Sequence, residues 1–312
     1  MASATAPEPP PPLERSFDAA WVEEIAEQND LTRMGVRPSL RGYLQELWKR
    51  RSFIKVLADS KARAQNQNTY LGQFWAVGTP VLNAIVYVLI FGFILQLGRK
   101  GISNTIAFIV VGTFLFRFFE MSIQAGAKSI SKNLNLVRSV HFPRAALPLA
   151  GVAAEVAVLG PALLVMILIS WGSGFLPLAS VSPVPISWRW LLLIPAILLL
   201  WMFNTGCAFI MARLVAETPD VDNIIPFAMR LLMYASGVIF SIDHFLGKFS
   251  WGWIMEYQPL AVYLSLARSS LLKEPAYPLD PVMWVAGAFW AVLVLVGGFF
   301  FFWGGEERYG RN

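Results

Sequence analysis

The sequence contains six stretches of mostly apolar residues, and each is long enough to cross a lipid bilayer as a helix. A membrane span needs about 20 apolar residues, and its backbone hydrogen bonds must be satisfied within the segment. Of the 312 residues, 56% are hydrophobic and 14% are charged, which is well below the charge content of a typical soluble domain. The sequence therefore predicts an all-α integral membrane protein with six transmembrane helices, at about residues 74–97, 104–125, 145–171, 189–213, 223–242 and 282–303.

Lysine and arginine are concentrated on one side of these predicted spans. Eleven of them lie in residues 39–66 or between the second and the third span: Arg41, Lys49, Arg50, Arg51, Lys55, Lys61, Arg63, Lys128, Lys132, Arg138 and Arg144. The opposite side carries fewer over more chain: Arg99, Lys100, Arg189, Lys248, Arg268 and Lys273. Because basic loops are retained in the cytoplasm, the pattern predicts a multi-pass protein with both termini cytoplasmic.

The chain before the first span divides into two parts. Residues 1–38 begin with a proline-rich stretch, continue with an acidic one and are expected to form a flexible cytoplasmic tail. Residues 39–66 are too charged to span the bilayer, but they place apolar side chains on one helical face: Leu40, Tyr43, Leu44, Leu47 and Trp48. This pattern favours an amphipathic helix in the membrane interface. The alternative is a soluble helix packed on other cytoplasmic parts. Residues 67–312 form the predicted transmembrane domain.

The segment between the fifth and sixth predicted spans is rich in aromatic residues. It includes "LAVYLSLARSSLL" (260–272), which is apolar but short and contains Arg268. We therefore expect a re-entrant or interfacial segment there. A seventh span would instead place the C-terminus outside.

Several polar residues lie within the predicted spans. In the second span Thr113, Arg117, Glu120, Gln124 and Lys128 recur at intervals of three or four, which draws one polar stripe down a helix. Further polar residues occur in other spans: Asn83, Tyr87, Glu155, Arg230 and Tyr234. Charges at that depth are costly unless they face protein or water. The stripes thus indicate either a water-accessible path or a helix-packing interface.

Motifs for chemistry on this chain are weak. Asp220 and Asp222 have the D-x-D spacing that holds a metal–nucleotide complex in some glycosyltransferases, but no second acidic cluster accompanies them. Cys207 is the single cysteine, and His141 and His244 have no partners at ligand spacing, so no metal site is indicated. The sequence has no G-x-x-x-x-G-K-[ST] phosphate loop. We expect no cofactor and no catalytic residue on this chain, so active transport would need energy from a separate protein or an ion gradient.

Four segments, in order, resemble ABC-2 type permeases that export lipid-linked polysaccharides. "NLNLVRSVHFPRAALPLAG" (133–151) is similar to the cytoplasmic coupling segment of that group, and "TYLGQFWAVGTP" (69–80) to the start of its first span. Residues 213–241 and 258–272 are similar to the segments on either side of its extracytoplasmic gate. The sequence departs from the usual pattern at Gln258, where asparagine is common, and in "KARAQNQN" before the first span.

The resemblance implies a homodimer of this chain with two copies of a cytoplasmic ATPase, which binds ATP and magnesium. It implies a bacterial cytoplasmic membrane, no nucleic-acid partner, and a lipid-linked polysaccharide that passes through a channel between the two copies. The similarity is greatest to actinobacterial galactan exporters. The alternatives are an ABC-2 exporter of small hydrophobic compounds and a membrane-embedded glycosyltransferase.

The resemblance also assigns residues. Contact with the ATPase falls on Asn133, Leu136, Val137, Val140, His141, Phe142, Pro143 and Arg144. We expect Pro143 to end a short helix there. The candidates for the channel and the re-entrant gate combine polar residues of the spans with aromatic residues of the gate region. They are Arg117, Glu120, Gln124, Glu155, Arg230, Tyr234, Phe240, Trp251, Trp253 and Tyr257.

Overall fold

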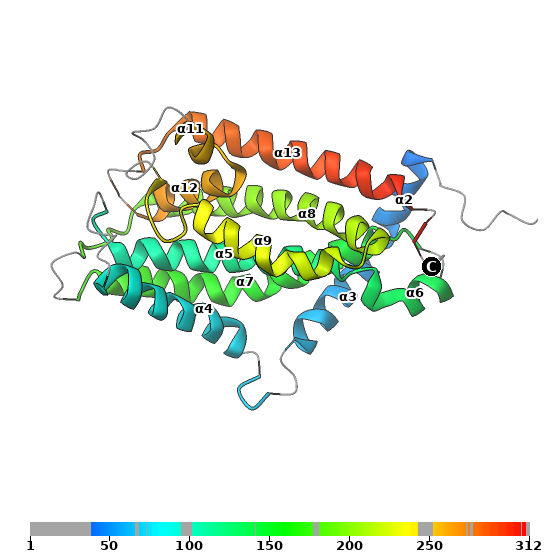
Figure 1. Ribbon diagram of the computed structural model, residues 1–312, viewed down its shortest axis with the longest axis horizontal. Helices are drawn as coiled ribbons and strands as arrows, with labels where there is room; N and C mark the ends of the chain where they lie inside the picture. Colours follow the sequence, from blue (N-terminus) through cyan, green and yellow to red (C-terminus); the bar gives the residue numbers. More distant parts are fainter. Residues whose placement is uncertain are drawn as a thin grey trace, which may run out of the picture. The chain divides into compact units, whose positions relative to one another are not determined.

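The computed structural model describes residues 39–65, 69–72, 74–94, 102–140, 142–176, 181–242, 252–272, 274, 277–306 and 308–309. Within these residues the chain forms helices and no extended strand (Figure 1). The predicted tail, residues 1–38, lies outside the described residues. The helices are α2 (Leu40–Lys49), α3 (Arg51–Ala64), α4 (Phe74–Tyr87), η1 (Val88–Ile94), α5 (Thr105–Ala127), η3 (Ser131–Asn133), α6 (Leu134–Ser139), α7 (Ala146–Ser173), η4 (Trp188–Leu192), α8 (Leu193–Glu217), α9 (Val221–Ala235), α11 (Gly252–Glu256), α12 (Pro259–Leu271) and α13 (Pro281–Gly304).

Five helical segments in the described part are long and apolar enough to cross a membrane. They are Phe74–Phe91, Thr105–Ala127, Ala146–Ser173, Trp188–Glu217 and Pro281–Gly304. Each corresponds to one of the predicted spans. The all-helical membrane architecture is thus confirmed, with five candidate spans.

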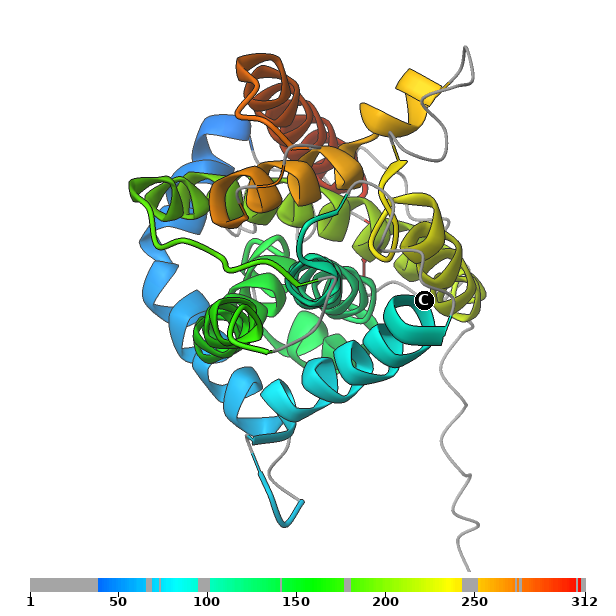
Figure 2. The same cartoon turned by 90° about the vertical axis from the view of Figure 1, so that its left-hand side faces the viewer.

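Helix α5 is the centre of the bundle. Its apolar window is 78% buried, against 17–44% for the other four candidate spans. It packs against α4, α7, α8, α9 and α12, and Figure 2 shows most of these helices arranged around it. Helices α8 and α13 approach each other closely because glycine stands at the crossing. A Cβ atom on Gly298 would overlap the backbone at Gly206, and small residues permit such close packing in membranes.

The fifth predicted span, 223–242, is not confirmed as a spanning helix. Its counterpart α9 has 15 residues, so it is about 22 Å long, whereas the bilayer core is about 30 Å thick. The helix ends before Gly237, whose φ of +68° lies in the left-handed region that favours glycine. Helix α12, with 13 residues, is also too short to count among the five and is almost entirely buried. Six spans and a re-entrant gate therefore stay predictions.

The predicted interfacial helix 39–66 is two helices, α2 and α3, separated by a break at Arg50 (φ −90°, ψ 15°). The five apolar residues of the predicted face all lie on α2, but they differ in burial. Tyr43 is 1% exposed, but Leu44 is 46% and Trp48 is 71% exposed. The wide apolar stripe is divided because Tyr43 has buried hydrogen-bond partners in the bundle, while Trp48 stacks with Arg51 outside it. Location of these helices in the membrane interface stays a prediction.

Candidate functional site

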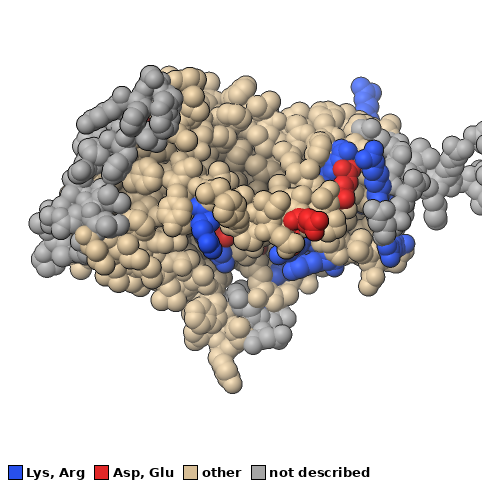
Figure 3. All heavy atoms as spheres, in the orientation of Figure 1, with Lys and Arg blue, Asp and Glu red and all other residues tan. Residues whose placement is uncertain are grey.

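The segment between α5 and α7 turns back at one end of the bundle and forms two short helices, η3 and α6. We call this end, where α5 ends and α7 begins, the basic end. On the face shown in Figure 3, charged side chains lie over the middle of the molecule and toward α6. Helix α6 ends at Ser139, and Val140 is already extended. The helix thus ends before Pro143, as the sequence predicts.

The residues predicted to contact an ATPase do not all lie on one surface. Val137, Phe142 and Pro143 are buried, and Asn133, Leu136 and Arg144 are half-buried. Val140 is 46% exposed, and His141 lies outside the described residues. Val137 and Phe142 belong to a cluster with Tyr43 and Ile130, and the Phe142 ring packs edge-on against Phe53. The outer face of α6 consists instead of Asn135, Arg138, Ser139 and Val140.

A buried polar junction joins three distant parts of the chain beneath α6. The Tyr43 hydroxyl donates to Glu306 Oε2 at 2.9 Å, and accepts from the backbone N–H of Ala145 at 3.0 Å. The backbone N–H of Arg144 donates to Glu306 Oε1 at 2.9 Å, and the Arg144 guanidinium donates to the Glu306 carbonyl. The junction therefore ties α2, the start of α7 and the chain after α13 together.

The electrostatics of the junction follow from its burial. Glu306 is 8% exposed. Burial raises the pKa of this carboxyl above its ordinary value, and the Arg144 N–H, the Tyr43 hydroxyl and the Arg144 charge oppose that rise. Burial also raises the pKa of Tyr43, as does the nearby Glu306 charge. Tyr43 and Glu306 were not predicted as site residues, because the two lie 263 residues apart in sequence.

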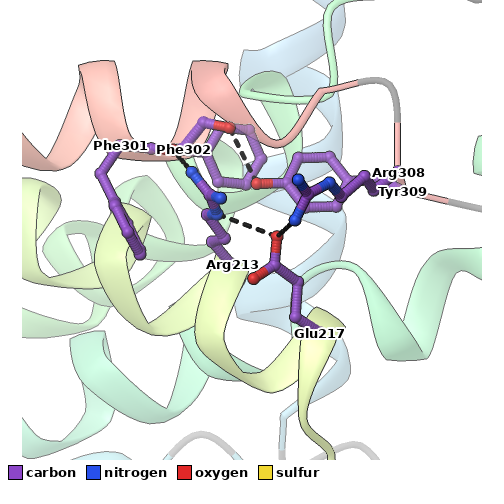
Figure 4. Close-up of polar contacts among 6 residues, drawn as sticks. All are labelled: Arg213, Glu217, Phe301, Phe302, Arg308 and Tyr309. Carbon is purple, nitrogen blue, oxygen red and sulfur yellow. Dashed lines mark hydrogen bonds and ion pairs between the residues drawn. The ribbon is translucent and has the colours of Figure 1, made fainter.

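A second polar cluster holds the chain after α13 against the end of α8 (Figure 4). Glu217 Oε1 accepts from Arg213 Nε at 3.0 Å and from Arg308 Nη1 at 3.3 Å. The Arg213 guanidinium also lies over the Phe301 ring, 4.3 Å from its centroid. The Tyr309 hydroxyl donates to the Phe302 carbonyl at 2.8 Å. Glu306, Arg308 and Tyr309, which follow the last span, are therefore held against the bundle at the basic end.

The polar stripe of the second span forms the contacts that its spacing predicts. Arg117 Nη1 lies 3.1 Å from Glu120 Oε2, and Gln124 Nε2 donates to Glu120 Oε1 at 3.4 Å. Glu155 of α7 is 5% exposed and accepts from Gln65 at the end of α3. Two neighbouring cavities lie between α3, α4, α5 and α7. Arg117, Gln124 and Glu155 each line at least one of them, whereas Glu120 lines neither.

The remaining gate candidates lie on or after α9. Arg230 and Tyr234 are exposed on α9, and Phe240 is half-buried. Trp253 is 62% exposed, the carbonyl of Tyr257 accepts from the Trp290 indole at 3.1 Å, and Trp251 lies outside the described residues. None of the described side chains among them lines the three cavities found in the described part of the chain.

Arg268 is a buried structural residue, whereas the sequence was used only to count it as a charge in an apolar segment. It is 1% exposed, and its guanidinium donates to the carbonyls of Gly237 and Val238 at 2.8 Å each. The same group lies 3.4 Å from the centroid of the Phe108 ring. It fixes the turn that follows α9. The Asp220–Asp222 pair is not a free acidic site, since Asp222 forms an ion pair with Lys128 at 3.6 Å.

Sequence comparison relates the chain to known transporters. Two O-antigen export system permease proteins RfbA of Klebsiella pneumoniae are each 26% identical to the chain, over 70% and 82% of it and 78% and 91% of their own lengths. The O-antigen export system permease protein RfbA of Myxococcus xanthus is 22% identical, over 78% of the chain and 89% of its own length. A family model described as ABC-2 type transporter matches residues 53–272, more than two thirds of the chain. The chain belongs to the ABC-2 type transporter family.

Proposed function

We propose that this chain is the membrane subunit of an ATP-driven exporter of a lipid-linked polysaccharide, with a galactan as the cargo. The glycan would cross through a channel between two copies of the chain. The names of the three relatives support polysaccharide export. The long apolar helices support a location within a membrane, which we assign to the bacterial cytoplasmic membrane.

The ATPase is proposed to be a separate cytoplasmic chain, present in two copies, which binds ATP and magnesium. The sequence supports this because it has no phosphate-binding loop. The basic end is assigned to the cytoplasm, together with both termini, because its lysines and arginines outnumber those of the opposite side.

The observation that carries the proposal is the construction of α6. Its inner side, with Val137, is packed into the cluster below, while Asn135, Ser139 and Val140 are exposed. A short exposed surface on a fixed base suits contact with a moving soluble partner. Motion applied to α6 would pass through Arg144 to α7 and, by way of Glu306, to α13.

The test is purification of the tagged full chain in a mild detergent, followed by identification and counting of its partners. We expect a P-loop ATPase in a two-to-two ratio. The double variant Asn135→Glu/Val140→Asp should lose the ATPase while remaining in the membrane, because both side chains are exposed. A matched double variant, Ser52→Glu/Val56→Asp, alters two exposed positions of α3, outside the candidate spans, and should keep it.

Analysis of surface glycan in a depleted strain tests the cargo. We expect loss of a cell-wall polysaccharide and accumulation of its lipid-linked form. Unchanged glycan together with sensitivity to a small hydrophobic compound would favour the drug-exporter alternative. A chain that purifies without any ATPase, or an α6 variant that retains it in full, would contradict the proposal.

A further inference from the structure

A cavity of about 540 Å³ opens at the basic end, between α3, α5 and α7. Three lysines line it, Lys61, Lys128 and Lys132, against one carboxylate, Glu155. Its walls also present the amides of Gln65, Gln124 and Asn133, and small side chains leave the space open. We call this cavity the lysine pocket. Its charge and its hydrogen-bond donors suit an anion.

The lysine charges are incompletely compensated. Among the described residues, Lys128 has Asp222 at 3.6 Å, but Lys61 and Lys132 have no carboxylate within ion-pair distance. Burial lowers the pKa of Lys61, and the positive charge of Lys132 lowers it further. Two ammonium groups that repel each other across a cavity would be stabilised by an anion between them.

A second cavity, of about 160 Å³, continues from the lysine pocket toward the middle of the bundle. The two share Gln65, Met121 and Glu155. Along α5 the second cavity is displaced by about seven residues, or about 10 Å of helix, from the lysine pocket. Its walls are mostly apolar and include Trp75 and Pro80 of α4, and its polar members are Gln65, Thr79, Arg117 and Glu155. We call it the apolar pocket.

The two pockets together form an amphipathic site that begins at the basic end and runs into a membrane span. We propose that this site binds the phosphate of a lipid, with the head group among Lys61, Lys128 and Lys132 and the first part of the chain in the apolar pocket. Lysine is a frequent ligand of phosphate, and basic pockets between transmembrane helices hold lipid phosphates. A soluble phosphate would leave the apolar pocket unused.

Two lipids share this chemistry: the phosphate-bearing carrier of an exported glycan, and an anionic phospholipid of the bilayer. Assignment of the site to the carrier rests on the proposed function. Binding of a lipid phosphate does not, because it follows from the pocket alone. The two sources are distinguished by competition.

The test is equilibrium binding of radiolabelled farnesyl diphosphate to the detergent-purified full chain. We expect Lys61→Gln/Lys132→Gln to weaken binding by about tenfold or more, since loss of 1.4 kcal/mol gives a factor of ten. The matched control Lys49→Gln/Lys55→Gln removes two exposed lysines of α2 and α3 that do not line the pocket, and it should bind as the wild type. Ala64→Trp, at an exposed position on the rim, should block binding without removing charge.

Equal binding by wild type and Lys61→Gln/Lys132→Gln would overturn the proposal, as would an equal loss in the control pair. Displacement of the probe by phosphatidylglycerol at equal concentration assigns the site to bulk lipid, and resistance to it assigns the site to a prenyl carrier. Normal glycan export by a variant that no longer binds the probe would overturn the carrier assignment and leave the exporter standing. Probe binding by a chain that recruits no ATPase would support the lipid-phosphate site and contradict the proposed exporter.

Discussion

Replacement of Tyr43 by phenylalanine should release α2 from the bundle. The side chain is 1% exposed, so the ring has no room to move toward water. The change removes a hydrogen bond to the Glu306 carboxylate and leaves the N–H of Ala145, itself fully buried, without its acceptor. A hydrogen bond to a charged group contributes about 1.5–3 kcal/mol, and a buried unpaired N–H costs about 1–3 kcal/mol.

These two effects together lower the free energy of undocking of α2 by about 3 kcal/mol, because both groups regain water as partners once the helix has lifted off. Isolated helices shorter than about 12 residues are marginal in water, so α2, with 10, should also lose its helical structure when undocked. Amide hydrogen exchange of residues 40–49 in the purified full chain therefore measures the effect. We expect an increase on the order of 100-fold, since 1.36 kcal/mol corresponds to a factor of ten.

Tyr309→Phe is the matched control for this experiment. Tyr309 is a buried tyrosine of the same cluster, but its hydroxyl makes one neutral hydrogen bond, to the Phe302 carbonyl. Its loss should cost about 1 kcal/mol and should leave exchange in α2 unchanged. If exchange in α2 rose equally in both variants, or in neither, the junction could not be what holds this helix.

Three further outcomes follow from buried contacts, each measured as a melting temperature of the detergent-purified chain. Burial raises the pKa of the Glu306 carboxyl above its ordinary value of 4.5. Its contribution to stability is therefore fully present below about pH 4.5 and is lost as pH rises through the folded-state pKa. Glu306→Gln should reduce this fall in melting temperature with rising pH, because glutamine does not titrate. Arg268→Lys should destabilise by about 3 kcal/mol, because lysine cannot reproduce the paired carbonyl contacts, whereas Arg230→Lys on the exposed face of α9 should not. Gly298→Ala should lower the free energy of unfolding by about 1–3 kcal/mol, because the added methyl group would overlap α8. Gly297→Ala is the control and should be neutral, since its position has open space around it. Equal effects of the two changes would contradict close packing at this crossing.

The long apolar runs made most of the fold predictable from sequence, because a chain in lipid has few alternatives to helix. Where boundaries differ, polar contacts explain the difference. The fourth span was predicted to end at residue 213, but α8 continues to Glu217, whose carboxylate pairs with Arg213 one turn earlier. The fifth was predicted to run to residue 242, but α9 stops at Ala235, and Arg268 binds the carbonyls of the turn that follows.

The candidate site was predictable only in part. The short helix between α5 and α7 could be expected from the motif at residues 133–151, and its end before Pro143 from the proline. Which side chains face outward could not be inferred, because the base that buries Val137 comes from α2 and from the chain after α13. Contacts such as that between Tyr43 and Glu306 join residues too far apart for any local pattern to indicate. The lysine pocket was missed for the same reason, since Lys61 was counted only as a basic residue before the first span.

The basic end combines two features that the proposed exporter would require at one place. Its exposed surface, the outer face of α6, adjoins a base that charge-assisted hydrogen bonds hold, since Arg144, between α6 and α7, contacts Glu306. The lysine pocket lies beside the same base, since Lys128, Lys132 and Asn133 belong to the segment that leads into α6. Under the proposed function, a push on α6 would therefore alter the lysine pocket directly, without a relay across the bundle. This predicts that ATP binding by the partner changes the affinity for farnesyl diphosphate, and that Tyr43→Phe weakens this coupling more than it weakens binding itself.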